Sequence, residues 1–244
     1  MIDTAILLAA GQGSRLRDTA PSKPLCPVAG VPLLDRALAS LAAAGIARAV
    51  VVTGYRAEAI EAHLAAGDWP LAVETARTAD WREPNGVSAL AAAGLIADEA
   101  LLAMCDHLVT PALYARLAET GARGGLTLGI DRRLGHPWID PEDVTCVATR
   151  GDRIRAIGKG LEPHDCYDVG VFAVSGAFFE ALRALPAPSI TEGVRALAAR
   201  DLAHVVDCSD LDWIDVDDAR ALAAAETWVS QTRSNVRQRS GDNP

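Results

Sequence analysis

The sequence predicts an α/β fold, a Rossmann-like and mostly parallel sheet with flanking helices and an antiparallel extension laid on it. Three observations support this. Apolar runs of strand length alternate with segments of helical periodicity up to about residue 106, which is typical of a parallel sheet with crossover helices. Beyond that point the pattern changes to apolar alternation with tight turns. Hydrophobic residues make up 50% of the 244, enough for one full core.

Each expected element follows from its local pattern. In the first half, strands are expected at 4–9, 49–53, 71–75 and 100–105, and helices at 33–44, 57–64 and 87–95. The extension, at about 125–175, contains strands at 125–131, 144–149, 154–158 and 167–174. Helices at 177–185, 190–199 and 218–229 and a strand at 203–208 complete one domain over residues 1–230. The polar residues 231–244 show no periodicity and are expected to be disordered.

Composition argues against several classes of protein. The net charge of −9 leaves no overall attraction for nucleic acid, so positive charge for binding anions must be local. The five cysteines are odd in number and lack Cys-x-x-Cys spacing, which argues against a disulfide framework and a zinc site. No run of 18 apolar residues and no signal-like leader occurs, so we expect a cytoplasmic protein without membrane insertion. The sequence leaves the oligomeric state open, a homodimer included.

The stretch LLAAGQGSRLRDTAPSKPL at residues 7–25 takes a strand directly into a basic, glycine-punctuated loop. Gly11 and Gly13 let the backbone approach an anion without a Cβ in the way, and Arg15, Arg17 and Lys23 add positive charge. The loop therefore predicts a phosphate site. It is not a dinucleotide fingerprint, because position 16 is leucine where a third glycine is needed, and no Gly-Lys pair has the spacing of a P-loop.

This order of strand, Gly-x-Gly-Ser-Arg-Leu, spacer and Ser-Lys-Pro-Leu resembles the signature of nucleotidyltransferases that join an NTP to a phosphorylated sugar or alcohol. Later segments look most like CTP:inositol-1-phosphate cytidylyltransferases: CDH at 105–107, IGKGL at 157–161, YDVGVF at 167–172, TEGVR at 191–195 and WIDVD at 213–217. The resemblance implies the nucleotide-diphospho-sugar transferase-like fold and a Mg²⁺-dependent reaction. Its implied partners are CTP and a phosphorylated small-molecule acceptor, which react to CDP-polyol and pyrophosphate.

This chemistry needs mainly electrostatic help, because the attacking phosphate oxygen is already anionic and charge develops on the leaving pyrophosphate. The resemblance implies Lys23 and Arg15 as catalytic residues at the triphosphate, and Lys159 as the catalytic residue at the acceptor phosphate. His107 is expected to form hydrogen bonds or pack, since a phosphate nucleophile needs no base.

Carboxylates are implied as the metal ligands. Asp106 follows the strand at 100–105, and ligands of open α/β sheets gather at the carboxyl ends of strands. The family's second metal carboxylate matches the cluster of Asp215 and Asp217, which share one side of an extended segment. We favour Asp215 of these two. Asp218 suits a helix N-cap.

Two further sets of residues are implied to contact the substrates. The nucleotide-binding set is Leu8, Ala9, Ala10, Gly11, Gln12, Gly13, Ser14, Asn85, Gly86 and Ser88. The acceptor-binding set is Lys159, Asp168, Thr191 and Glu192. Local chemistry offers simpler roles for some of them, since Asn-Gly is a good turn and Thr191-Glu192 suits a helix start.

Departures from the family pattern leave other interpretations open. Val169 stands where threonine is usual, and the segment LGHPW at 134–138 also differs. Trp138 with Tyr167 could face a quaternary ammonium by cation–π attraction, which would make the acceptor phosphocholine or an aminoalkyl phosphonate. Outside the enzymes, the alternative is a nucleotide-binding regulatory module that lost its chemistry. The complete set of candidate catalytic residues argues against that alternative.

Overall fold

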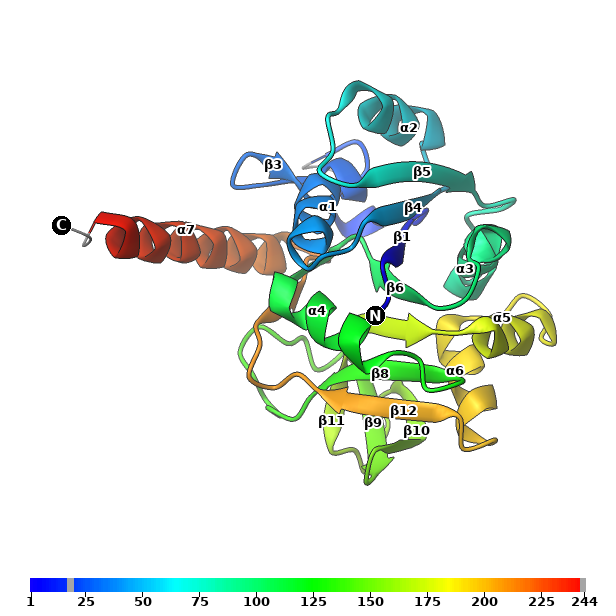
Figure 1. Cartoon of the computed structure of the whole chain (residues 1–244). Helices are drawn as coiled ribbons and strands as arrows, with labels where there is room; N and C mark the ends of the chain where they lie inside the picture. Colours follow the sequence, from blue (N-terminus) through cyan, green and yellow to red (C-terminus); the bar gives the residue numbers. More distant parts are fainter. Residues whose placement is uncertain (17–19, 242–244) are drawn as a thin grey trace.

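The computed structural model describes residues 1–16 and 20–241, with side chains described through residue 232. Its main strands are β1 Thr4–Ala9, β4 Arg48–Thr53, β5 Ala72–Arg77, β6 Ala100–Met104, β8 Leu126–Asp131, β9 Thr145–Arg150, β10 Arg153–Lys159, β11 Cys166–Val174 and β12 Ala203–Asp207. They form one nine-stranded mixed sheet in the order β5-β4-β1-β6-β11-β8-β12-β10-β9 (Figure 1). The α/β fold expected from the sequence is confirmed.

The first four of these strands form the parallel half of the sheet. β1 pairs in parallel with β4 on one side and with β6 on the other, and β5 continues beyond β4. Alternate residues of β1 enter different cores, Leu7 on one face of the sheet and Ile6 on the other. A strand buried on both faces has no solvated side, which explains the continuous apolar run in its sequence.

The antiparallel half continues the same sheet. β11 pairs antiparallel with β6 and with β8, and β12 pairs in parallel with β8. The β9–β10 hairpin completes the sheet, and β9 also pairs with the start of β11. The antiparallel extension expected from the sequence is thus part of the same sheet rather than a layer on it. The free edge of β6 is instead paired by β11, which satisfies its backbone hydrogen-bonding groups.

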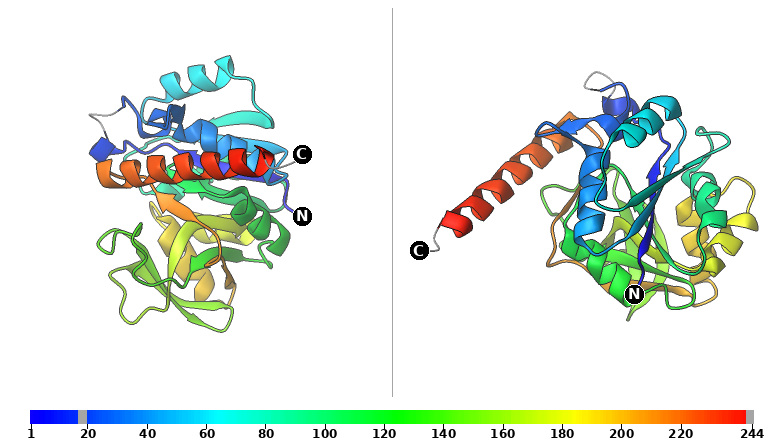
Figure 2. Two further views of the ribbon diagram at one scale, coloured as in Figure 1. Left: turned by 90° about the vertical axis from the view of Figure 1, so that its left-hand side faces the viewer. Right: turned by 45° about the horizontal axis from the view of Figure 1, so that its top comes forward.

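Helices cover both faces of this sheet (Figures 1 and 2). One face carries α1 Leu33–Ala43, α2 Ala57–Ala66 and α4 Pro111–Thr120, and the other carries α3 Asn85–Ala92, α5 Gly176–Arg183 and α6 Ile190–Ala198. Single 3-10 turns occur at η1 Ser14–Leu16, η2 Lys23–Leu25 and η3 Ala93–Leu95. Each helix buries one apolar stripe, as the periodicity predicts. Among the described residues, no helix is long and apolar enough to span a membrane.

Two short antiparallel ribbons lie outside the main sheet. β2 Pro27–Val28 pairs with β3 Val31–Pro32, and β7 His107–Val109 pairs with β13 Trp213–Asp215. Strands of two or three residues are too short to show an alternation pattern, so the sequence did not predict them. The β7–β13 ribbon has the larger consequence, because it joins segments about a hundred residues apart.

The last helix, α7 Ala219–Gly241, is longer than expected. Its first turns cover a third apolar cluster that includes Leu16, Ile214 and Val229, and the rest extends away from the body (Figures 1 and 2). The sequence pattern suggested disorder from residue 231, whereas α7 continues to residue 241, and residues 242–244 lie outside the described part of the chain. Adding residues to an existing helix needs no apolar face, and segment 231–241 contains no proline to stop it.

Candidate active site

The candidate site lies at the carboxyl edge of the parallel strands. β1 and β6 are hydrogen-bonded neighbours, so the loop leading to Lys23 and the turn carrying Asp106 leave the sheet side by side. The β7–β13 ribbon then sets Asp215 opposite His107. Three segments far apart in the chain therefore meet at one place.

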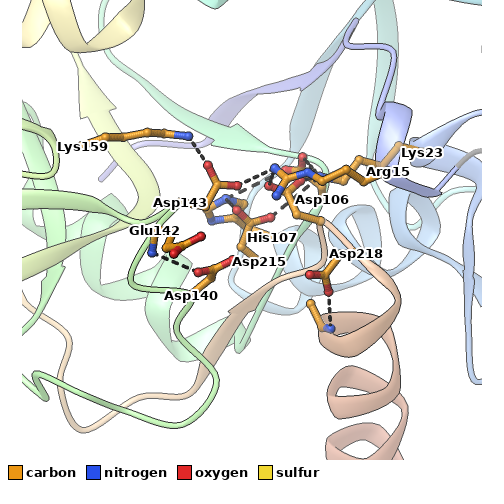
Figure 3. Close-up of polar contacts among 12 residues, drawn as sticks. Arg15, Lys23, Asp106, His107, Asp140, Glu142, Asp143, Lys159, Asp215 and Asp218 are labelled. Carbon is orange, nitrogen blue, oxygen red and sulfur yellow. Dashed lines mark hydrogen bonds and ion pairs between the residues drawn. The ribbon is translucent and has the colours of Figure 1, made fainter.

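Lys23 is the buried centre of a charged cluster (Figure 3). Its side chain is only 6% exposed, and its Nζ lies 2.5 Å from Oδ2 of Asp106 and 3.8 Å from Oδ1 of Asp215. The same ammonium contacts Oδ1 of Asp217. Burial alone would lower the pKa of Lys23, but the Asp106 and Asp215 carboxylates outweigh burial and raise the pKa above its ordinary value. The charged ammonium holds together three carboxylates that would otherwise repel one another.

Two carboxylate oxygens of this cluster fit a further cation. Oδ1 of Asp106 and Oδ1 of Asp215 are buried and have no hydrogen-bond partner. With His107, these residues offer one ligand atom each, all within 4.8 Å of one another. Buried oxygens of this kind are costly unless a cation compensates them, and hard divalent cations prefer oxygen ligands. The structure thus contains the acidic cluster that the sequence predicted, with donor atoms suited to such an ion.

His107 is engaged through both ring nitrogens. Nδ1 lies 3.0 Å from the carbonyl oxygen of Val169, and Nε2 lies 3.4 Å from Oδ2 of Asp215. Burial alone would lower the pKa of the imidazole, but the Asp215 and Asp106 carboxylates outweigh it and raise the pKa to about 9. Hard divalent cations prefer oxygen ligands, so the carboxylates are the favoured candidates for binding such an ion. His107 instead has the hydrogen-bonding role that we expected.

Trp213 packs against the ring of His107 and helps to position it. The two rings stack with centroids 6.0 Å apart, and Nε1 of Trp213 donates to the fully buried Asp131 at 2.8 Å. Arg133 pairs with the same carboxylate at 2.8 Å. Burial alone would raise the pKa of Asp131, but the hydrogen bonds from Arg133 and Trp213 lower it below its ordinary value. Sequence reasoning missed this support, whose only signal was an aspartate at the end of an apolar strand.

Two glycines of the sequence motifs make room for these basic side chains. Gly13 has φ +58°, and a Cβ there would lie 2.8 Å from Cδ of Lys23 and closer still to its Cβ. Gly170 has φ +75°, and a Cβ there would lie 2.9 Å from Cγ of His107. A Cβ at Gly11, by contrast, would meet nothing within 4 Å. Gly13 is therefore needed so that the Lys23 side chain can pack against the backbone. The backbone at Gly11 remains open to an approaching anion.

A pocket with an empty volume of about 1150 Å³, its open mouth included, lies beside the charged cluster. The predicted site residues that line it are Arg15, Asn85, Lys159, Asp168, Thr191, Asp215 and Asp217. Asp168 accepts from the N–H of Gly170 at 2.7 Å, and burial raises the pKa of its carboxyl to about 6. The pocket therefore connects Arg15, expected on the nucleotide side, to the residues expected at the acceptor.

An alternating row of charges crosses this pocket (Figure 3). Lys159 contacts Asp143, and Asp143 contacts Arg15. Nη2 of Arg15 lies 2.7 Å from Oδ2 of Asp217, the carboxylate that also contacts Lys23. Asp143 is the member that sequence reasoning missed. It lies in the irregular loop 132–144, where a single aspartate has no pattern, and only its place between two cations identifies it.

The nucleotide-side residues divide between the loop and a packing contact. Leu8, Ala9 and Ala10 are buried at the end of β1, and Gly11, Gln12, Gly13 and Ser14 are partly or fully exposed; Arg17 lies outside the described residues. Oδ1 of Asn85 accepts from the N–H of Ile190 at 2.9 Å. A Cβ on Gly86 would lie 3.0 Å from the carbonyl carbon of Pro188, and Ser88 is buried outside the pocket lining. Asn85 and Gly86 therefore join α3 to the start of α6, and only Asn85 also faces the pocket.

Two residues considered on the acceptor side are absent from the pocket lining. The Glu192 carboxylate accepts from the N–H and the hydroxyl of Ser189, at 2.7 and 2.8 Å, and completes a capping box for α6. Tyr167 is buried outside the lining, so it does not form an enclosure with Trp138, which packs on Trp228 with ring centroids 5.7 Å apart. The local role as a helix start therefore accounts for Glu192.

Asp218 also has its expected capping role. Its Oδ1 accepts from the N–H of Ala221 at 2.7 Å, in the first turn of α7. This contact positions the start of α7 directly after Asp215 and Asp217.

Known proteins resemble this chain in sequence and in fold. Over 236 residues, it is 34% identical to the bifunctional IPC transferase and DIPP synthase of Rubrobacter xylanophilus, covering 92% of this chain and 51% of that protein. It is 29% identical over 253 residues to the CMP-5'-(3-aminopropyl)phosphonate synthase of Streptomyces rubellomurinus, with coverages of 96% and 40%. The chain thus spans about half the length of the curated relatives it matches, or less.

Among solved structures, the inositol-1-phosphate CTP transferase from T. maritima shares the fold, with a TM-score of 0.79 and 24% identity. The superposition covers 90% of this chain and 91% of that one. Residues 5–199 match the MobA-like NTP transferase domain, well over half of the chain. The chain therefore belongs to the family of MobA-like NTP transferase domains, which confirms the nucleotidyltransferase class expected from its sequence.

Proposed function

We propose that this chain transfers the cytidylyl group of CTP to the phosphate of a polyol phosphate, with inositol 1-phosphate as preferred acceptor, and requires Mg²⁺. An acceptor phosphate oxygen attacks the α-phosphorus of CTP, the bond to the bridging oxygen of the β-phosphate breaks, and pyrophosphate leaves. The names of similar proteins, which include an inositol-1-phosphate CTP transferase and a CMP-phosphonate synthase, support cytidine as the base.

The observation that carries this proposal is the buried ammonium of Lys23 among three aspartates, two of which have a buried oxygen without a hydrogen-bond partner. Joining two polyanions requires positive charge where they meet and no general base. Lys23 and Arg15 approach this place from the loop after β1, and Lys159 approaches it from β10. The three aspartates would hold Mg²⁺, which when bound supplies Lewis-acid stabilisation of the phosphates.

Pyrophosphate release tests the proposal across a matrix of four NTPs and five acceptors. The acceptors are inositol 1-phosphate, phosphocholine, aminoethylphosphonate, glycerol 3-phosphate and glucose 1-phosphate. We expect the highest kcat/KM for CTP with inositol 1-phosphate. UTP should be rejected. A site that accepts a hydrogen bond from the exocyclic amine of cytosine would leave that hydrogen-bond acceptor without a donor when uracil binds. Absence of pyrophosphate release from every pair would refute the proposal.

Asp106→Asn tests the metal requirement. We expect a retained fold and a loss on the order of 10²-fold or more in kcat, the scale for removal of a major electrostatic stabiliser. EDTA should abolish the activity of the unchanged chain. Asp68→Asn, which changes an exposed aspartate between α2 and β5, is the matched control. Full activity of Asp106→Asn in EDTA would rule out the metal.

The two lysines should have separable effects. Lys23→Ala should weaken CTP binding, whereas Lys159→Ala should raise the acceptor KM or lower kcat with CTP binding intact. Calorimetry with CTP distinguishes these outcomes, and equal loss of CTP affinity in both variants would contradict the division.

An aminoalkyl phosphonate or phosphocholine is the second candidate acceptor. Trp138 and Trp213 line the pocket together with the carboxylates of Asp140 and Asp168, surroundings that suit an ammonium group. The Streptomyces relative, by its name, forms a CMP-aminopropylphosphonate. If either acceptor exceeds inositol 1-phosphate tenfold in kcat/KM, the acceptor assignment is wrong and cytidylyl transfer still stands.

A further inference from the structure

Asp143 bridges two cations that come from opposite sides of the pocket (Figure 3). Its Oδ2 contacts Nη2 of Arg15, in the loop after β1, and its Oδ1 contacts Nζ of Lys159, at the end of β10. One carboxylate thus forms ion pairs with both the cation expected at the triphosphate and the cation expected at the acceptor phosphate.

The three side chains differ in burial, and the carboxylate is more buried than either cation. The Asp143 side chain is 22% exposed, whereas those of Arg15 and Lys159 are 50% and 62% exposed. Hydrogen bonds from Lys159 and Arg15 lower the pKa of Asp143 below its ordinary value despite burial, so the carboxylate is ionised at neutral pH. Solvent screens the ion pairs that Asp143 forms with these exposed cations and so weakens them. A phosphate has more charge and more acceptor oxygens than a carboxylate and can therefore replace it.

The loop that carries Asp143 is anchored at its middle. Nη2 of Arg220 donates to the carbonyl oxygen of Pro137 at 3.2 Å, and the ring of Trp138 packs on Trp228. Asp143 itself follows in a short turn, with its N–H donating to the carbonyl oxygen of Asp140 at 3.2 Å. Release of Asp143 from the two cations therefore requires movement of a side chain or of this turn, with the anchored part in place.

We propose that Asp143 is a shared counter-ion that couples the nucleotide and acceptor sites. It holds Arg15 and Lys159 until substrate phosphates replace it. A nucleotide phosphate at Arg15 repels the Asp143 carboxylate, which then moves away from both cations and leaves Lys159 available to the acceptor. Because such coupling is reciprocal, an anion at Lys159 favours the nucleotide by the same factor. The inference rests on the proposed roles of Arg15 at the nucleotide and Lys159 at the acceptor phosphate. Asp143 acts through these cations as a positioning residue.

Calorimetry on the full chain tests the coupling without any turnover. The probes are the α,β-methylene analogue of CTP, which cannot release pyrophosphate, and inorganic phosphate, which stands for the acceptor phosphate. We expect the analogue to tighten phosphate binding by a factor of about 5 or more in the unchanged chain, the usual lower range for coupled sites. In Asp143→Asn, phosphate should bind equally with and without the analogue, and more tightly than it binds the unchanged chain alone.

Glu142→Gln is the matched control, because it removes the same charge from the neighbouring, exposed residue. It should keep the coupling of the unchanged chain. If the loss of one negative charge or a general disturbance of the loop were enough to remove the coupling, Glu142→Gln would remove it too. Absence of coupling in the unchanged chain overturns the inference, whatever the variants do. Retained coupling in Asp143→Asn overturns it as well. Because these measurements need no acceptor turnover, a failed pyrophosphate assay would refute the proposed function and leave this result readable.

Discussion

Replacing Gly170 by alanine tests how the β11 backbone places His107. The residue has φ +75°, and a Cβ there would lie 2.9 Å from Cγ of His107. The left-handed backbone costs a non-glycine residue about 1–2 kcal/mol. Displacing the imidazolium from the carbonyl of Val169 and from Asp215 costs about 1.5–3 kcal/mol more, the range for hydrogen bonds of charged groups. The free energy of unfolding should therefore fall by about 2.5–5 kcal/mol in total.

Gly124→Ala is the matched control, since Gly124 has φ +78° and a Cβ there would meet nothing within 4 Å. It carries the backbone cost alone, so its loss of stability should be about half as large or less. Any change in the entropy of the unfolded chain is the same in both variants and cancels. Chemical denaturation measures both, and pyrophosphate release should fall strongly only in Gly170→Ala. Equal stability of the two variants, with full activity in Gly170→Ala, would refute this account of the glycine.

Three further outcomes can be measured on the same chain. A Cβ at Gly158 would lie 2.5 Å from Nη2 of Arg195, whose Nε donates to the carbonyl oxygen of Ile157 at 2.8 Å, so Gly158→Ala should displace this guanidinium from the end of β10 and raise the acceptor KM, while calorimetry shows unchanged CTP affinity. Glu192→Ala should cost about 1 kcal/mol of stability through the lost capping box and leave kcat unchanged; a large loss of kcat would restore its role at the acceptor. The lowered pKa of Asp131 means that its stabilisation is present above the ordinary carboxyl range and is lost as pH falls through its folded-state pKa. The difference in unfolding free energy between the unchanged chain and Asp131→Asn should therefore shrink below about pH 4, and a difference constant from pH 7 to pH 3 would contradict the shift.

Local patterns were sufficient for most of the fold. The buried run of β1 and the stripe of α1 each involve residues within a few positions of one another, so propensity and periodicity identify them. The sequence gives no position for the end of α7, because a polar helix has no apolar stripe to mark it. The position of β11 beside β6 was not predicted, because strand order depends on which edge is left unpaired, and no short segment records that.

The candidate site divides in the same way. Lys23, Asp106 and Asp215 could be proposed because each stands in a recognisable motif next to a strand or helix end. Motif position did not distinguish a ligand from a cap at Glu192, whose carboxylate the helix start uses. Asp143 had no motif at all.

Local patterns along the chain were enough to indicate the α/β class, the candidate phosphate loop and the enzyme class, because each periodic element and each motif involves residues close together in the sequence. The tertiary structure alone decided that Asp215 faces His107 across a three-residue ribbon, that Asp131 supports Trp213, and that Asp143 bridges two cations. The physical reason is that each of these contacts joins residues far apart in sequence. Their closeness depends on the packing and backbone hydrogen bonding of the whole sheet, which are the sum of many weak interactions and leave no mark in any one segment.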